Sequence, residues 1–151
     1  MKHKTLHINR WGFTILELIL VFAIIAIVGA AMLYFLNPAD QFAQARNNHR
    51  ISDVNNIASA IRSRMTHNRG TFGTGCASGD LPTSTKQMGS GALNYNIEPC
   101  IVPTDISVLP LDPLTGTSTA TGYFIIYNST TTQFTITAPG AELGQMISIT
   151  R

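Results

Sequence analysis

The sequence has few of the residues from which catalytic and metal sites are built. It contains two cysteines and four histidines in 151 residues, and 12% of its residues are charged. No Ser-His-Asp, Cys-His or paired-carboxylate pattern emerges along the chain. The two cysteines have no histidine near them in the sequence, which argues against a zinc site. These absences give no support to an enzyme or to a resident cofactor.

Acidic residues are also missing from the first 16 positions, which carry Lys2, Lys4 and Arg10. Residues 13–36 follow as a 24-residue apolar run whose single charge is Glu17. A helix of that length rises about 36 Å, enough to cross a hydrocarbon core of about 30 Å. The basic residues ahead of the run predict a single-pass membrane protein with a cytoplasmic N-terminus and with the rest of the chain outside.

Glu17 is the unusual residue of this run, because a charge inside a membrane span costs about 3 kcal/mol on insertion scales. Cleavage after Gly12 would place a new amino terminus on Phe13, four residues from Glu17 and on the same helix face. The amine and the carboxylate would then neutralise each other, within one subunit or between neighbours. Pairing of this kind is what charges in hydrocarbon usually require.

A basic leader that ends at Gly12, followed by Phe13 and then by Glu17, resembles the prepilin signal of type IV pilins and pseudopilins. The resemblance implies that prepilin peptidase cuts after Gly12, that Phe13 is N-methylated and that Glu17 guides assembly. It further implies a subunit held in the membrane before assembly, which an inner-membrane platform adds to a homo-oligomeric helical filament outside the cell. A pseudopilin of a type II secretion or DNA-uptake system shares all these residues.

Three other interpretations remain open. An ordinary secretory signal would be cut near residues 28–30, although its apolar region would contain Glu17 and exceed the usual length of about 7–15 residues. An uncleaved anchor accounts for the apolar run but leaves Glu17 without a partner. A membrane-anchored extracellular binding module belongs to a different functional class, and it predicts an intact leader and a concave apolar site.

The chain as a whole predicts an α+β architecture. We expect residues 1–12 as leader, 13–36 as the apolar half of a long helix, 37–68 as its amphipathic half and 69–151 as a globular head. Pro38 cannot donate a helical hydrogen bond, so a kink or melted turn is expected there. This arrangement is similar to the type IV pilin fold, in which the upper half of a long N-terminal helix packs on a small antiparallel sheet.

The amphipathic half has an apolar stripe to bury and a polar face to leave in water. The stripe recurs at helical spacing from residue 51 and consists of Ile51, Val54, Ile57, Ala58, Ile61 and Met65, with Phe42 ahead of it. Residues between these positions, among them Arg46, Arg50, Asp53, Asn56 and Arg64, predict the solvated face. We expect the arginines to pair with the acidic heads of neighbouring subunits; contact with DNA phosphates is an alternative without further support.

The C-terminal third predicts the sheet. Residues 123–127 and 133–137 read as a hairpin, and residues 145–150 as a third strand. Residues 93–97 are expected to form a short strand, and the proline-punctuated residues 99–113 an extended surface connection.

Cys76 and Cys100 both fall on the side expected to be extracellular, where a disulfide is favoured. That bond would staple the glycine-rich residues 70–91, which read as a loop. Asp105 and Asp112 raise a calcium hypothesis, because some pseudopilins hold calcium in this part of the fold. The sequence around them lacks the dense run of oxygen ligands of a calcium loop, so no metal is our primary expectation.

Overall fold

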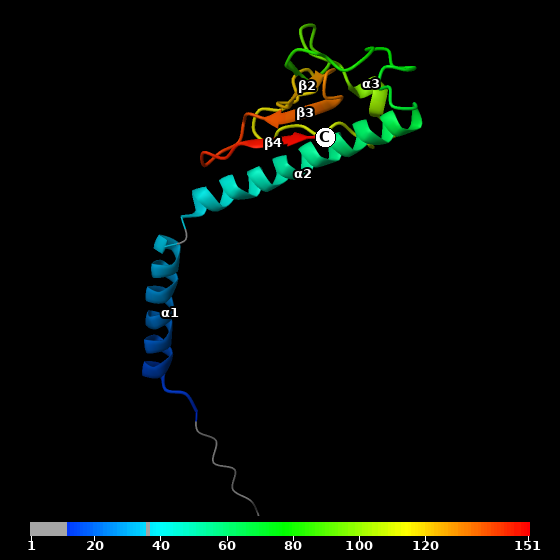
Figure 1. Cartoon of the computed structure of the whole chain (residues 1–151). Helices are drawn as coiled ribbons and strands as arrows, with labels where there is room; N and C mark the ends of the chain where they lie inside the picture. The colour runs from blue at the N-terminus through cyan, green and yellow to red at the C-terminus, as the bar shows by residue number, and fades with distance from the viewer. Residues whose placement is uncertain (1–11, 36) are drawn as a thin grey trace, which may run out of the picture. The chain divides into compact units, whose positions relative to one another are not determined.

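The computed structural model describes residues 12–35 and 37–151, so the leader ahead of Gly12 lies outside the described residues (Figure 1). The chain forms two compact units, one that ends at Ala39 and one, here named the head unit, that begins at Asp40. The class is α+β, as predicted. The elements are α1 (Ile15–Phe35), α2 (Pro38–His67), β1 (Lys86–Gln87), α3 (Glu98–Ile101), β2 (Phe124–Asn128), β3 (Gln133–Ala138) and β4 (Ile147–Thr150).

The first unit contains α1, a helix of 21 residues that rises about 32 Å. None of its residues is buried, and it is long and apolar enough to cross a membrane. A signal sequence near an N-terminus would meet the same test. The apolar side chains of α1 are therefore exposed on every side of the helix.

The single long helix expected between residues 13 and 68 is two helices. α1 ends at Phe35 and α2 begins at Pro38, so the interruption falls where proline predicted it. Asn37 has a φ of 35°, a left-handed conformation that asparagine tolerates better than most residues. Pro38 is well placed as the first residue of α2, because amides of the first turn have no helical acceptor in any case.

The sheet has four antiparallel strands in the order β1-β2-β3-β4. β2 and β3 form the predicted hairpin, and β4 is the predicted third strand. The prediction of a strand at residues 93–97 is wrong. Tyr95 makes only an isolated bridge with Met88, and the short strand β1 pairs with β2 instead. Three residues after Tyr95 the chain enters α3, which ends the extended run.

The core of the head unit lies between α2 and one face of the sheet (Figure 1). Ile125, Ile136 and Ile149 are register partners across three strands and therefore share that face. The central part of the predicted stripe is buried against them, namely Val54, Ile57, Ala58 and Ile61. The stripe fails at its N-terminal end, because Phe42 is 65% exposed and Ile51 is 42% exposed.

Residues 99–113 are only in part the surface connection that the prolines predicted, since most of their side chains are exposed or half-buried but four are buried. α3 occupies the start of the segment, and Cys100 and Ile101 at its end are buried. Further along, Leu109 and Asp112 are buried as well. Apolar residues and the cysteine draw this segment into the core, and proline punctuation alone does not reveal that.

Candidate functional site

The first candidate site is the start of α1. Gly12 and Phe13 lie before the first helical turn, and Phe13 is 82% exposed. A Cβ added at Gly12 would meet nothing within 4 Å. The peptide bond between these two residues is therefore open to a protease, which needs an exposed segment outside regular structure.

Glu17 lies in the first turn of α1, where the helix end itself favours a carboxylate. The backbone amide of Glu17 donates to Oγ1 of Thr14 over 3.2 Å, so Thr14 acts as the N-terminal cap. This role was not predicted from the sequence, although Thr-x-x-Glu ahead of an apolar run is the capping-box pattern. The helix terminus thus stabilises Glu17 in the uncleaved chain, in addition to any amine that cleavage would supply.

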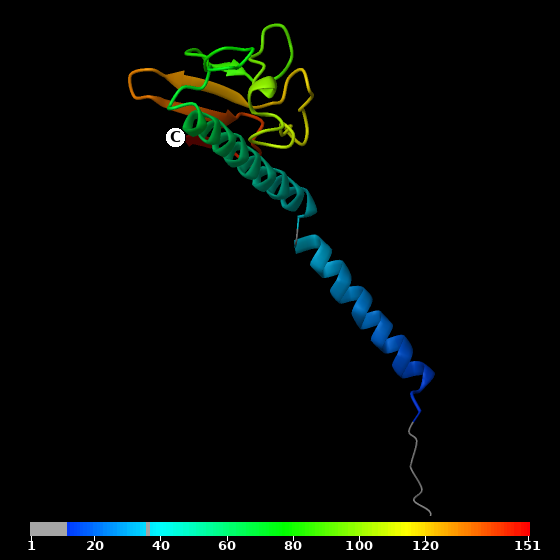
Figure 2. The same ribbon diagram turned by 90° about the vertical axis from the view of Figure 1, so that its right-hand side faces the viewer.

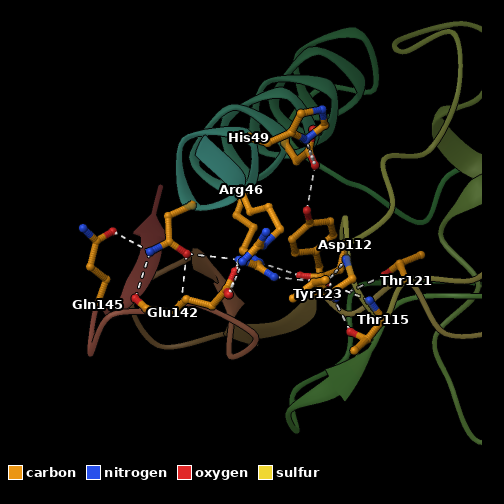
Figure 3. A network of polar contacts seen from close by, with 12 residues as sticks. Arg46, His49, Asp112, Thr115, Thr121, Tyr123, Glu142 and Gln145 are labelled. Atoms are coloured by element: carbon orange, nitrogen blue, oxygen red, sulfur yellow. Dashed lines mark hydrogen bonds and ion pairs between the residues drawn. The ribbon is translucent and has the colours of Figure 1, made fainter. Parts of the chain in front are cut away.

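The second candidate site is a network of polar contacts in the head unit (Figure 3). Arg50 is at its centre, and its side chain is 0% exposed. Its Nε donates to Oδ2 of Asp112 over 2.6 Å, and its Nη1 donates to Oε2 of Glu142 over 2.9 Å. The expectation that Arg50 and Asp53 lie on a solvated face is therefore wrong. Both side chains point into the head unit and are satisfied there.

Glu142 attaches the turn between β3 and β4 to α2. Its carboxylate accepts from Nε and Nη2 of Arg46 over 2.7 and 2.6 Å, and its backbone amide and carbonyl both bond to the side chain of Asn47. Arg46 and Arg50 were expected to pair with acids of neighbouring subunits. They pair with acids of their own chain, which leaves Arg62 and Arg69 as the exposed arginines of this region.

Asp112 anchors the other side of the network. Its Oδ1 accepts from the amides of Leu114 and Thr115 and from the Thr115 hydroxyl. Burial alone would raise the pKa of Asp112, but the hydrogen bond from Arg50 and those from the two amides lower it to about 2. Both oxygens of Asp112 are thus engaged by donors.

This arrangement does not fit the calcium hypothesis for Asp105 and Asp112. The Arg50 guanidinium occupies the position beside Asp112 that a cation would need. Asp105 lies 4.0 Å from Nδ1 of His67 instead. Across residues 12–35 and 37–151, no group of three or more His, Cys, Asp or Glu side chains is placed to hold a metal ion.

A further contact ties the residue ahead of β2 to α2. The Tyr123 hydroxyl donates to Oδ2 of Asp53 over 2.7 Å, and burial together with this bond raises the pKa of Tyr123 (Figure 3). Nδ1 of His49 lies 3.0 Å from the same oxygen.

The predicted disulfide between Cys76 and Cys100 is present, with 4.9 Å between the two Cα atoms. Arg64 on α2 donates to the carbonyls of Phe72, Thr74 and Cys100, so it holds both ends of the stapled loop.

The chain was compared with models of protein families, with curated proteins and with solved structures, and none of the three comparisons finds a match.

Proposed function

We propose that this chain is the precursor of a pilin-like structural subunit, cut after Gly12 by a prepilin peptidase and built into a helical filament through α1. The observation that carries the proposal is α1 itself. It is apolar on every side, has no residue buried within the described chain and bears a carboxylate in its first turn. An exposed peptide bond lies directly ahead of it, and a folded α+β head unit follows.

The exposed surface of α1 needs a cover, because contiguous apolar patches of this size are rare on soluble monomers. Lipid supplies the cover before assembly, and the helices of neighbouring copies supply it in the filament. Ala26 and Ala30 stand four residues apart on α1, a small-xxx-small spacing that lets two helices approach closely. The head units then form the outer wall of the filament.

Glu17 sets the register between copies in this proposal. Once the chain is cut, the amine of Phe13 on an incoming copy meets the carboxylate of Glu17 on a copy already in the filament. Inside an apolar bundle an unpaired charge is costly, so only the axial position that pairs both groups is stable. N-methylation of Phe13 would leave the amine able to carry its positive charge.

The test is to express Glu17→Ala together with the assembly motor and platform. We expect this variant to insert and to be cleaved like the wild type, because the segment remains apolar, but to yield at least tenfold fewer filaments. Thr14→Ala is the matched control, since it weakens the same helix end and retains the carboxylate. Normal filaments from Glu17→Ala would refute the register role.

A pseudopilin of a type II secretion or DNA-uptake system is the alternative function, and it uses the same processing and the same pairing. Filaments from cells that express only this subunit with its motor separate the two. Long surface fibres support the pilin, and short polymers confined to the cell envelope support the pseudopilin.

A further inference from the structure

The turn between β2 and β3 carries a short motif that the proposed function does not use. Asn128 is the last residue of β2, and Ser129 and Thr130 follow it in the turn. Asparagine, followed by any residue except proline and then by serine or threonine, is the acceptor motif for N-linked sugars. No other asparagine in the sequence has serine or threonine two positions after it.

The motif lies at an exposed end of the sheet. Asn128 and Gln133 form the last register pair of the β2–β3 hairpin, and residues 129–132 form the turn beyond that pair. Asn128 and all four turn residues are exposed. In Figure 2 this turn, drawn in orange, projects from the edge of the head unit. A modifying enzyme can therefore reach the motif while the head unit stays folded.

The turn orients the side-chain amide of Asn128. Its Oδ1 accepts from the backbone amides of Thr130 and Thr131 over 2.9 and 3.3 Å. Because only the oxygen of a side-chain amide can accept these bonds, Nδ2 is the atom on the other side of the group. Within the part of the chain that the structure describes, Nδ2 has no hydrogen-bond partner. The turn thus uses the oxygen of Asn128 and leaves its nitrogen available.

The hydroxyl of Thr130 is likewise not used by the fold. Thr130 contributes its backbone amide to the turn, and its hydroxyl bonds to no group among the described residues. An aspartate at position 128 would accept the same two amides, and an alanine at position 130 would donate the same one. The turn therefore explains neither the amide nitrogen of Asn128 nor the hydroxyl of Thr130, which are the two groups that the acceptor motif requires.

We propose that Asn128 is a glycosylation site, and that the donor is an oligosaccharide carried on a lipid diphosphate. In the transfer, a bond forms between Nδ2 of Asn128 and C1 of the first sugar, and the bond between C1 and the phosphate oxygen breaks. The nitrogen gives one proton to a base of the transferase, and the lipid diphosphate leaves with the electron pair. Nothing is oxidised or reduced. The proposal rests on the proposed function only because it needs the head unit to be outside the membrane.

The test is the intact mass of the full-length protein from cells that carry the assembly machinery, followed by fragmentation of its reduced tryptic peptide 87–151. We expect the wild type to be heavier by one oligosaccharide, attached at Asn128. Asn128→Asp keeps an oxygen for the turn and should lose the added mass completely. Thr130→Ala should lose it as well, whereas Thr130→Ser should keep it, because serine also satisfies the motif.

Thr131→Ala is the matched control, since it removes an exposed hydroxyl next to the motif and leaves the motif intact. This variant should carry the same added mass as the wild type. An unmodified wild type would overturn the proposal. Added mass that persists in Asn128→Asp would also overturn it, because the sugar would then be attached elsewhere.

The N-terminus of the same samples separates this site from the proposed function. A chain that begins at Phe13 and carries no sugar would overturn the site and leave the proposed function standing. A chain that carries the sugar on Asn128 but begins at Met1 would support the site and contradict the proposed function. A chain that is neither cut nor modified would overturn both.

Discussion

Arg50 and Asp112 form an ion pair closed to solvent, with 2.6 Å between Nε and Oδ2 and side chains 0% and 1% exposed. The two residues are 62 positions apart in the sequence, and their pair joins α2 to the segment ahead of β2. The free-energy cost of removing two charges from water offsets most of the stabilisation that their mutual attraction provides. The main consequence of the pair is therefore geometric, since it fixes where the two segments of the head unit meet.

Removing one partner of this pair should be far more damaging than removing a surface partner. Asp112→Ala leaves the Arg50 guanidinium buried and short of a carboxylate, so we expect a loss of about 3–5 kcal/mol in the free energy of unfolding. Urea unfolding in detergent, followed by near-ultraviolet circular dichroism of the buried tyrosines, measures it. Arg46→Ala is the control: its pair with Glu142 is 30% and 26% exposed, so a much smaller loss is expected. Equal losses would contradict this account of the network.

Stability should fall in acid because of Asp112. Its pKa in the folded chain is about 2, below the value of about 4 for an unfolded aspartate, so its contribution is complete above about pH 4 and is lost as pH falls toward 2. We expect this residue to contribute about 2 kcal/mol at neutral pH. Hydrogen bonds from Arg46 and Arg50 also lower the pKa of Glu142, so the free energy of unfolding falls more steeply in acid. When the free energy of unfolding is measured from pH 7 to pH 2, it should fall less steeply for Asp112→Asn than for the wild type. An identical pH dependence in the two proteins would show that residues other than Asp112 cause the loss of stability in acid.

The disulfide should stabilise the head unit by about 3 kcal/mol, because it closes a loop across a sequence separation of 24 residues in the unfolded chain. The double variant Cys76→Ser/Cys100→Ser tests this in the same unfolding assay. A reducing agent should destabilise the wild type by a similar amount and leave the variant unchanged. An unaltered midpoint in the variant would show that the Arg64 contacts alone hold the loop.

Gly122 is expected to resist substitution for two reasons that can be separated. Its φ is 88°, and an added Cβ would lie 2.5 Å from Cβ of Asp112. Gly144 has a φ of 68° but nothing within 4 Å of an added Cβ, so Gly144→Ala measures the backbone cost alone, about 1–2 kcal/mol. Gly122→Ala should cost more than that and should disturb the Arg50–Asp112 pair. Equal losses of stability for the two variants would show that the segment around Asp112 shifts easily to make room for the added methyl group.

The parts of the fold that depend on residues close together in the sequence were predictable from the sequence. The apolar run, the break at Pro38 and the β2–β3 hairpin each follow from a local pattern. β1 was missed because a strand of two residues has no periodicity of its own and exists only through its pairing with β2.

The Arg50 network was missed because its members are distant in the sequence and charged residues between apolar ones normally face water. One signal was available nonetheless. Arg50 precedes Val54 by four residues and Ile57 by seven, so it lies in phase with the buried stripe. A charge in that phase predicts a buried partner, although the sequence does not identify Asp112 as that partner.

The measurement that tests the central claim most directly is the intact mass and N-terminal sequence of the protein isolated from cells that carry the assembly machinery. Our account predicts a chain that begins at Phe13 and carries one methyl group on its amine. A chain that still begins at Met1, or one that begins near Ala31, would contradict it.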